Sequence, residues 1–193
     1  MKHLLTILAV AALTSAAAFA ADSSAPALEY GVHGGLNFGT MSNAASGVGS
    51  ETGVVAGLVA QYPLMDYLAI QPELNFIQKG AGSSAETIKL NYLELPVLLK
   101  GQYNLGGVKP FVEAGPKIGL LLSASDTTGL ITKSDFNSID FGFDFGLGVS
   151  VPVAENVDVY VEGRYAVGVT NINATAGAST TNNGFQVQVG LLF

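Results

Sequence analysis

The chain of 193 residues has no cysteine and no tryptophan, and charged side chains make up only 12% of it. Without cysteine, neither a disulfide framework nor a lipid-modified N-terminal cysteine is expected. With two histidines in the whole sequence, no metal site built on thiolates or a histidine pair is expected either. An ordinary globular protein carries about twice this share of charge, so the chain has too few charges to coat a water-facing surface.

Basic residues and long apolar runs are also scarce. Eight Lys and Arg residues against fifteen Asp and Glu residues give a net charge of −7. Because no basic stretch is present to neutralise phosphates, nucleic-acid binding is excluded. Beyond the first twenty residues no apolar run approaches the roughly 18 residues of a membrane-spanning helix, although the mean hydropathy is +0.42. A helical membrane protein is therefore excluded.

The N-terminus has the three parts of a secretory signal peptide. Residues 1–3 are a short positive region, residues 4–12 are apolar, and residues 18–20 read Ala-Phe-Ala, a typical cleavage site. Residues 1–20 are therefore predicted to be removed, and residues 21–193 to form the mature domain outside the cytoplasm.

The mature chain is dominated by alternation of apolar and polar residues. In residues 140–151 every odd position is Phe, Leu or Val and every even position is Asp, Gly or Ser. This period of two is typical of a β-strand with one apolar face, and residues 68–76 and 185–193 repeat it. Such runs predict eight strands, at residues 29–39, 53–62, 67–79, 88–101, 108–122, 138–151, 157–170 and 184–193.

The predicted connections alternate between short and long. The short ones are residues 63–66, 102–107 and 152–156, and the long polar ones are residues 40–52, 80–87, 123–137 and 171–183. An even strand number with short turns on one rim and long loops on the other is typical of bacterial outer-membrane barrels. We therefore predict an all-β fold, an eight-stranded antiparallel up-and-down transmembrane β-barrel whose closure leaves no unpaired edge in lipid.

Alternation alone also fits a soluble barrel with an apolar interior, so the composition of the polar face decides between the two. That face is rich in glycine, at positions 31, 35, 57, 115, 119, 142, 146, 148, 168 and 190. Glycine weakens a solvent-exposed strand, whereas inside a narrow barrel it leaves room for large polar side chains. The polar face is therefore predicted to point inward and the apolar face toward lipid.

Two features near the strand ends agree with this orientation. The chain ends in a phenylalanine preceded by apolar residues at every second position, which resembles the C-terminal signal read by the outer-membrane assembly machinery. The residues of this predicted assembly signal are Phe185, Val187, Val189, Leu191 and Phe193. Aromatic residues near the short-turn rim, predicted to form an interfacial girdle, are Tyr30, Tyr62, Tyr67, Tyr103 and Phe111.

Several short segments resemble a known family. They are Tyr62-Pro63-Leu64, residues 70–74 (Ile-Gln-Pro-Glu-Leu), 78–80 (Gln-Lys-Gly), 91–100 (Asn-Tyr-Leu-Glu-Leu-Pro-Val-Leu-Leu-Lys), 114–116 (Ala-Gly-Pro), 162–165 (Glu-Gly-Arg-Tyr) and 168–172 (Gly-Val-Thr-Asn-Ile). Together they resemble the outer-membrane β-barrel family common in Bacteroidetes, the PorT-like or porin family. The resemblance implies an eight-stranded barrel in the outer membrane of a Gram-negative bacterium, and it implies no biochemical activity.

The inward face also carries charge. Seven charged residues share the inward parity: Glu73, Glu94, Glu113, Lys117, Asp144, Glu162 and Arg164. Because buried charges must be paired, we predict a salt-bridge network that fills the lumen, in preference to a paired-carboxylate acid/base site or a proton path. Arg164, the only arginine, is predicted to be its hub, since a guanidinium can bridge two carboxylates.

Other chemistry has little support in the sequence. His33 is the only histidine of the mature chain and Ser150 the only serine placed on the inner face of a strand, which is a weak basis for a hydrolase. Asp126, Asp135 and Asp140 flank the third long loop and suggest a solvated loop more than a calcium site. No enzyme activity, cofactor or metal is therefore expected.

The sequence predicts a small outer-membrane protein with a structural or surface-interaction role, displaying four extracellular loops around a side-chain-filled lumen. The alternative is a narrow pore for ions or small solutes, and a lipid-modifying enzyme is a more distant one. The expected partners are outer-membrane lipid, the assembly machinery during biogenesis, and an unidentified ligand of the loops.

Overall fold

The computed structural model describes residues 28–42, 49–82, 87–127, 133–172 and 180–193. The predicted signal peptide lies outside the described residues. In the described part, eight strands and a short 3₁₀ helix follow one another along the chain. They are β1 (Glu29–Met41), β2 (Gly49–Met65), β3 (Leu68–Gly82), β4 (Thr87–Gln102), β5 (Lys109–Asp126), η2 (Lys133–Asp135), β6 (Ile139–Ala154), β7 (Val157–Gly168) and β8 (Asn182–Leu192).

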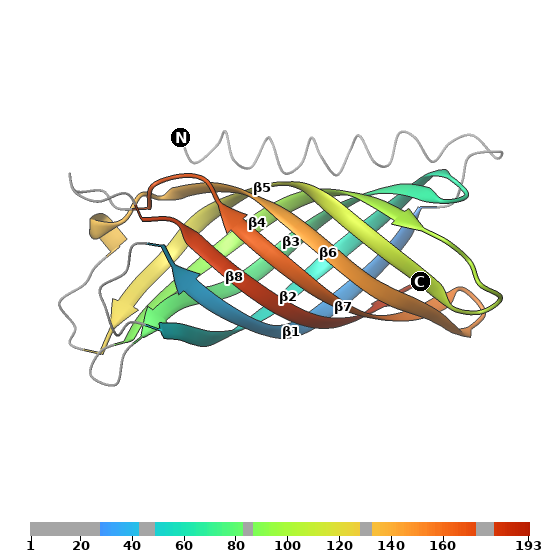
Figure 1. The fold of residues 1–193 in the computed structure, drawn as a ribbon, viewed down its shortest axis with the longest axis horizontal. Helices are drawn as coiled ribbons and strands as arrows, with labels where there is room; N and C mark the ends of the chain where they lie inside the picture. Colours follow the sequence, from blue (N-terminus) through green and yellow to red (C-terminus); the bar gives the residue numbers. More distant parts are fainter. Residues whose placement is uncertain (1–27, 43–48, 83–86, 128–132, 173–179) are drawn as a thin grey trace.

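The strands form one closed barrel in sequence order (Figure 1). Each strand pairs antiparallel with the next, and β1 closes the ring by pairing antiparallel with β8 from Gly31↔Leu192 to Met41↔Asn182. The three short turns lie at the same end of the barrel as the C-terminus (Figure 1). This arrangement confirms the predicted fold class. No helix in the described ranges is long and apolar enough to cross a membrane.

Most strands are longer than predicted, and the β2–β3 and β6–β7 turns are correspondingly tighter, whereas β7 ends two residues earlier than predicted. β2 begins at Gly49 and ends at Met65, so that only Asp66 and Tyr67 separate it from β3. Between β6 and β7 the turn residue Asn156 has φ 60°, a left-handed conformation that asparagine tolerates better than most residues. Every strand except β8 exceeds the roughly 9–11 residues that span a bilayer, so the barrel extends beyond the membrane.

The faces of the barrel follow the predicted parity. Outward side chains such as Phe141, Phe143 and Phe145 are exposed, while the inward Asp140 and Asp144 beside them are buried. A barrel that exposes its apolar residues and buries its charged ones is suited to lipid outside and a packed polar interior.

Inward glycines stand opposite the bulkiest inward side chains. Gly190 pairs across the strands with Tyr160, and Gly148 and Gly146 pair with Phe111 and Glu113. A Cβ atom at Gly146 would lie 2.8 Å from Cγ of Glu113, and a Cβ atom at Gly190 would overlap the Tyr160 ring. Each glycine therefore provides the space that its large neighbour occupies, as the narrow interior requires.

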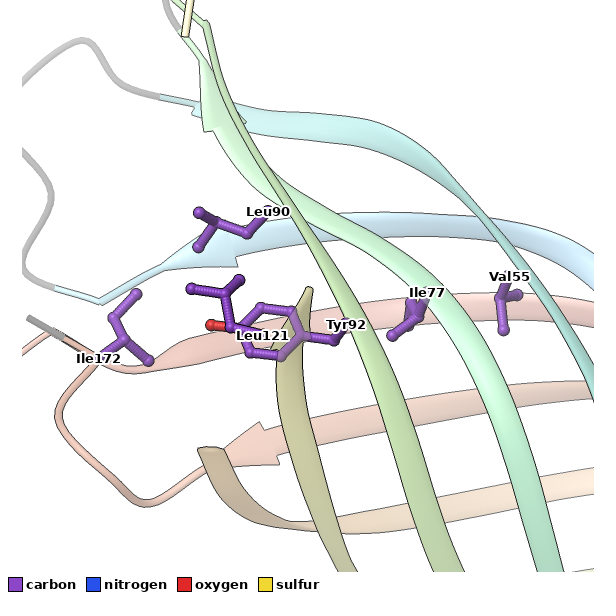
Figure 2. Packing of buried hydrophobic residues seen from close by; sticks show 6 residues of the cluster. All are labelled: Val55, Ile77, Leu90, Tyr92, Leu121 and Ile172. Carbon is purple, nitrogen blue, oxygen red and sulfur yellow. The ribbon is translucent and has the colours of Figure 1, made fainter. Parts of the chain in front are cut away.

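Two apolar clusters lie inside the lumen, one toward each end. The first, near the long connections, contains Val55, Ile77, Leu90, Tyr92, Leu121 and Ile172 (Figure 2). The second, near the short turns, contains Val59, Phe111, Tyr160 and Leu192. The prediction that Phe111 belongs to the outer aromatic girdle is wrong, because it shares the inward parity of Glu113 and its ring packs edge-on against Tyr160 at 6.2 Å. Tyr30, Tyr67 and Tyr103 are exposed, and Tyr62 is half-buried.

The charged residues of the lumen lie mainly between these clusters. Along β5, Glu113 and Lys117 lie between Phe111 and Leu121. Along β7 and the residues after it, Glu162 and Arg164 in the same way follow Tyr160 and precede Ile172. The interior is therefore layered, with apolar side chains at both ends and charge in the middle.

Candidate functional site in the lumen

The seven charged residues singled out from the sequence all point into the barrel, and each is at most 4% exposed. They come from five consecutive strands. Glu73 lies on β3, Glu94 on β4, Glu113 and Lys117 on β5, Asp144 on β6, and Glu162 and Arg164 on β7. The structure brings them together in two groups.

The first group surrounds Arg164. Its Nη1 lies 2.6 Å from Oε2 of Glu73, and its Nη2 lies 2.6 Å from Oε1 of Glu113 and 2.8 Å from Oε1 of Glu162. Nη2 also donates a hydrogen bond of 2.8 Å to Oε1 of Glu73, so the Glu73 contact is bidentate. A single guanidinium thus joins three carboxylates from three strands, a use of the planar donor fork that a lysine cannot reproduce.

The second group surrounds Glu94. Lys79 Nζ lies 2.6 Å from Oε1 of Glu94 and 3.3 Å from Oδ2 of Asp140. Lys117 Nζ lies 2.9 Å from Oδ1 of Asp144 and 3.8 Å from Oε2 of Glu94. Acids and bases therefore alternate across the lumen, as the low-dielectric interior requires.

Three charged residues of the lumen were missed by the sequence reasoning. Lys79 and Lys100 are buried on the inner face, and Asp140 is as well. Asp140 does not flank a solvated loop as suggested, because its carboxylate accepts hydrogen bonds from Lys79, Thr170 and Asn182. Within the described residues no group of three or more His, Cys, Asp or Glu residues is arranged to hold a metal.

The missed residues change the charge count. The buried acids are Glu73, Glu94, Glu113, Asp140, Asp144 and Glu162, and the buried bases Lys79, Lys100, Lys117 and Arg164. The described lumen therefore holds six acidic and four basic groups, an excess of two acids, where the sequence count of five against two gave an excess of three. The signal was present in the sequence, because Lys79 has the same parity as Glu73, and Lys100 the same parity as Glu94.

Lys100 occupies a mixed polar and aromatic site near the short turns. Its Nζ donates a hydrogen bond of 3.1 Å to Oε1 of Gln71, and it lies 4.1 Å from the ring centroid of Phe111 and 5.3 Å from that of Tyr160. Gln71 in turn donates to Glu73 and Glu113. Lys100 is thereby linked to the Arg164 group through the amide of Gln71, and to the apolar cluster near the short turns through two cation–π contacts.

His33 and Ser150 do not form a nucleophile pair. The His33 ring nitrogens lie 3.0 Å from the hydroxyl of Tyr160 and 2.8 Å from Oδ1 of Asn75. Ser150 donates its hydroxyl hydrogen to Asp158 at 3.0 Å. A hydrolytic triad needs the serine within hydrogen-bond reach of the histidine, and both residues are engaged with other partners.

The residues of the predicted assembly signal lie on the outward face of β8 and at the residue that follows it, Phe193. Phe185, Val187, Val189, Leu191 and Phe193 are all exposed on the lipid-facing side. The final residue is also held to the first strand, because the backbone amides and carbonyls of Tyr30 and Phe193 bond reciprocally at 2.9 and 2.8 Å. The C-terminal residue is thus part of the seam that closes the barrel.

The closed eight-stranded barrel, its apolar outer face and its charged interior define a small integral membrane barrel. The chain belongs to the family described as the outer membrane protein beta-barrel domain, which matches residues 19–174. The protein is accordingly located in the outer membrane, with lipid around its outer face.

Solved structures with a similar fold include Neisserial surface protein A, with a TM-score of 0.63 and 17% identity over 86% of this chain and 95% of that one. Ail, the attachment invasion locus protein of Yersinia pestis, has a TM-score of 0.49 and 12% identity over 86% of this chain and 98% of that one. No curated protein matches the chain in sequence. At 17% identity the likeness to Neisserial surface protein A concerns the fold alone.

Proposed function

We propose that this protein has a structural or surface-interaction role, in which the barrel anchors four extracellular loops and its lumen carries no solute. The observation that supports this role is the layered filling of the lumen. Charged groups bonded to one another lie between an apolar cluster that includes Leu121 and Ile172 and another that includes Phe111 and Tyr160. An apolar constriction excludes water and therefore ions.

The proposal includes the absence of an enzymatic activity. His33 and Ser150, the side chains that a hydrolase would need, are engaged with Asn75, Tyr160 and Asp158. In the Arg164 group, the carboxylates of Glu73, Glu113 and Glu162 each contact the same guanidinium. That arrangement favours a structural plug over an acid/base pair, which requires a carboxylate free to exchange a proton with a substrate.

The proposed partners are the assembly machinery during biogenesis and an unidentified ligand of the loops. The finer family placement, among the PorT-like barrels of Bacteroidetes, is likewise a proposal, and it rests on segments such as residues 91–100 and 162–165. The proposed ligand of the loops and the proposed family placement are independent, because the role of the loops does not depend on the bacterial group.

Conductance in planar bilayers tests the filled lumen. The refolded mature chain, residues 21–193, should give no current steps above those of protein-free bilayers, because two apolar clusters interrupt any water path. A Leu121→Ser and Phe111→Ser double variant, which places a polar side chain in each of the two clusters, is the positive comparison. Steady conductance that rises with the amount of wild-type protein would make the narrow pore the better account.

A complementation experiment tests the role of the loops. In a deletion strain, envelope defects should be corrected by the full chain and not by a barrel whose long connections are replaced with short turns. Equal correction by both chains would show that the loops are dispensable and would overturn the surface-interaction role.

Removal of Phe193 tests the assembly signal. The truncated chain should reach the outer membrane at a much lower level than the intact chain, while refolding in detergent should change less. The smaller effect in detergent comes from the loss of two backbone hydrogen bonds to Tyr30, each contributing about 0.5–1.5 kcal/mol. The larger effect in cells comes from the loss of the side chain that the assembly machinery recognises. Phe193→Ala, which keeps the backbone bonds, is the matched variant, and equal outer-membrane levels of all three chains would contradict the prediction.

A further inference from the structure

A groove of about 390 Å³ lies on the barrel wall near the short-turn end. It lies where the β2–β3 turn meets the β4–β5 hairpin, and its lining includes Tyr67, Gly101, Tyr103, Pro110 and Val112. The groove is shallow and open along most of its surface, so a ligand in it would lie along the barrel wall. None of the residues that line it is charged.

Gly101 creates the open space. It alternates with the buried Lys100 and shares the outward parity of the exposed Leu99, so a side chain at this position would point away from the lumen. A Cβ atom here would meet nothing closer than Val112 Cγ2, at 3.8 Å. Inward glycines such as Gly146 are filled by a neighbour, whereas the space over Gly101 is left open.

The walls of the groove suit the edge of a membrane. Tyr67 is 59% exposed and Tyr103 68% exposed, and tyrosines gather at the level of lipid headgroups. Val112 and the neighbouring Leu99 are exposed apolar residues of the lipid-facing surface. In barrels of this class the short turns are periplasmic. The groove therefore lies at the periplasmic end of the lipid-facing surface, at the level of the periplasmic leaflet.

We propose that the groove binds one acyl chain of a phospholipid from the periplasmic leaflet of the outer membrane. The chain lies over Gly101 against Val112, and the hydroxyls of Tyr67 and Tyr103 lie at the depth of the ester and headgroup region. Hydrocarbon is the matching ligand, because the lining is uncharged and is continuous with the surface that lipid already covers. A peptide added as a further strand does not fit, since the barrel is closed and has no free edge to pair with.

Two glycine-to-leucine variants test the proposal. Gly101→Leu fills the groove, and Gly34→Leu is the matched control, because Gly34 is also outward and a Cβ there meets only the carbonyl oxygen of Val55, at 3.7 Å. The probe is phosphatidylethanolamine retained per barrel, measured by native mass spectrometry in a mild detergent. Wild type and Gly34→Leu should each retain one lipid per barrel. Gly101→Leu should retain about tenfold less lipid, because each methylene group of the acyl chain that the leucine excludes removes apolar burial.

Equal retention by Gly101→Leu and wild type, or no lipid retained by wild type, would overturn the proposal. A fluorescence measurement covers the case in which Gly101→Leu does not fold. The chain has no tryptophan, so Tyr103→Trp supplies a single reporter at the groove and Tyr30→Trp one on a distant strand at the same rim. Phosphatidylethanolamine with brominated acyl chains should quench Tyr103→Trp at a lower lipid fraction than Tyr30→Trp, and identical quenching curves would refute a groove-bound chain.

Discussion

Replacing Arg164 with alanine should lower the free energy of unfolding by about 3–5 kcal/mol at pH 7, the usual effect of breaking a buried ion pair. Arg164 is 1% exposed and contacts the carboxylates of Glu73, Glu113 and Glu162. Without the guanidinium, three buried carboxylates remain with Lys100 as the nearest other cation of their group. Urea unfolding of the refolded barrel in lipid vesicles measures the loss.

Two comparisons separate lost charge compensation from lost packing. Lys109→Ala removes a partly exposed ion pair with Asp158 at the rim and should cost no more than about 1 kcal/mol. Adding Glu162→Gln to Arg164→Ala should restore part of the stability, and lowering the pH to 5 should do the same, because protons then neutralise carboxylates that have lost their cation. Wild-type stability of Arg164→Ala at pH 7, or a large conductance without loss of stability, would instead indicate a hydrated channel.

Phe145→Arg should lower the free energy of unfolding in lipid by about 2–4 kcal/mol, the cost of a cationic side chain near the bilayer midplane. Phe145 is outward, 52% exposed, and lies in the middle part of β6, where its cross-strand neighbours are Ala114 and Tyr165. Neither neighbour offers a carboxylate to pair with the new charge, so the guanidinium would have to face hydrocarbon.

The matched control for this variant is Val153→Arg. Val153 is an exposed residue of the same strand, but it lies at the short-turn end, where the depth-dependent cost falls to about 0–1 kcal/mol. Equal stabilities of Phe145→Arg and wild type in vesicles would mean that the lipid-facing and lumen-facing sides of the barrel had been exchanged.

Much of the fold could be predicted from the sequence, because apolar and polar residues alternate with a period of two along a barrel strand. The prediction for residues 138–151 differs from β6 (Ile139–Ala154) by only a few residues at the ends. β2 was predicted to begin at residue 53, but it begins at Gly49, where the polar Gly49 and Ser50 pair with Gly82 and Ala81 of β3. That extension rests on backbone pairing with another strand, which residue type does not reveal.

The candidate site was predicted less completely. The alternation of inward and outward positions identified the seven charged residues predicted to face the lumen. The same alternation also places Lys79, Lys100 and Phe111 on the inner face, together with Glu73, Glu94 and Glu113 of their strands, but these three residues were not predicted. The error in Phe111 came from reasoning by position near the rim, where aromatic residues usually face lipid. Alternation was the stronger signal, since the pleat of the strand allows no exception without a bulge.

The sequence by itself determined which face of each strand is apolar, where glycine leaves space, and which charges must be buried. Only the tertiary structure decided which of these charges meet. Arg164 and Glu73 lie 91 positions apart in the chain and on strands that are not neighbours, yet they form a bidentate pair across the lumen. Side-chain parity fixes the direction of a residue, whereas its height and its partner depend on the stagger between strands, which is set only when β1 and β8 close the barrel.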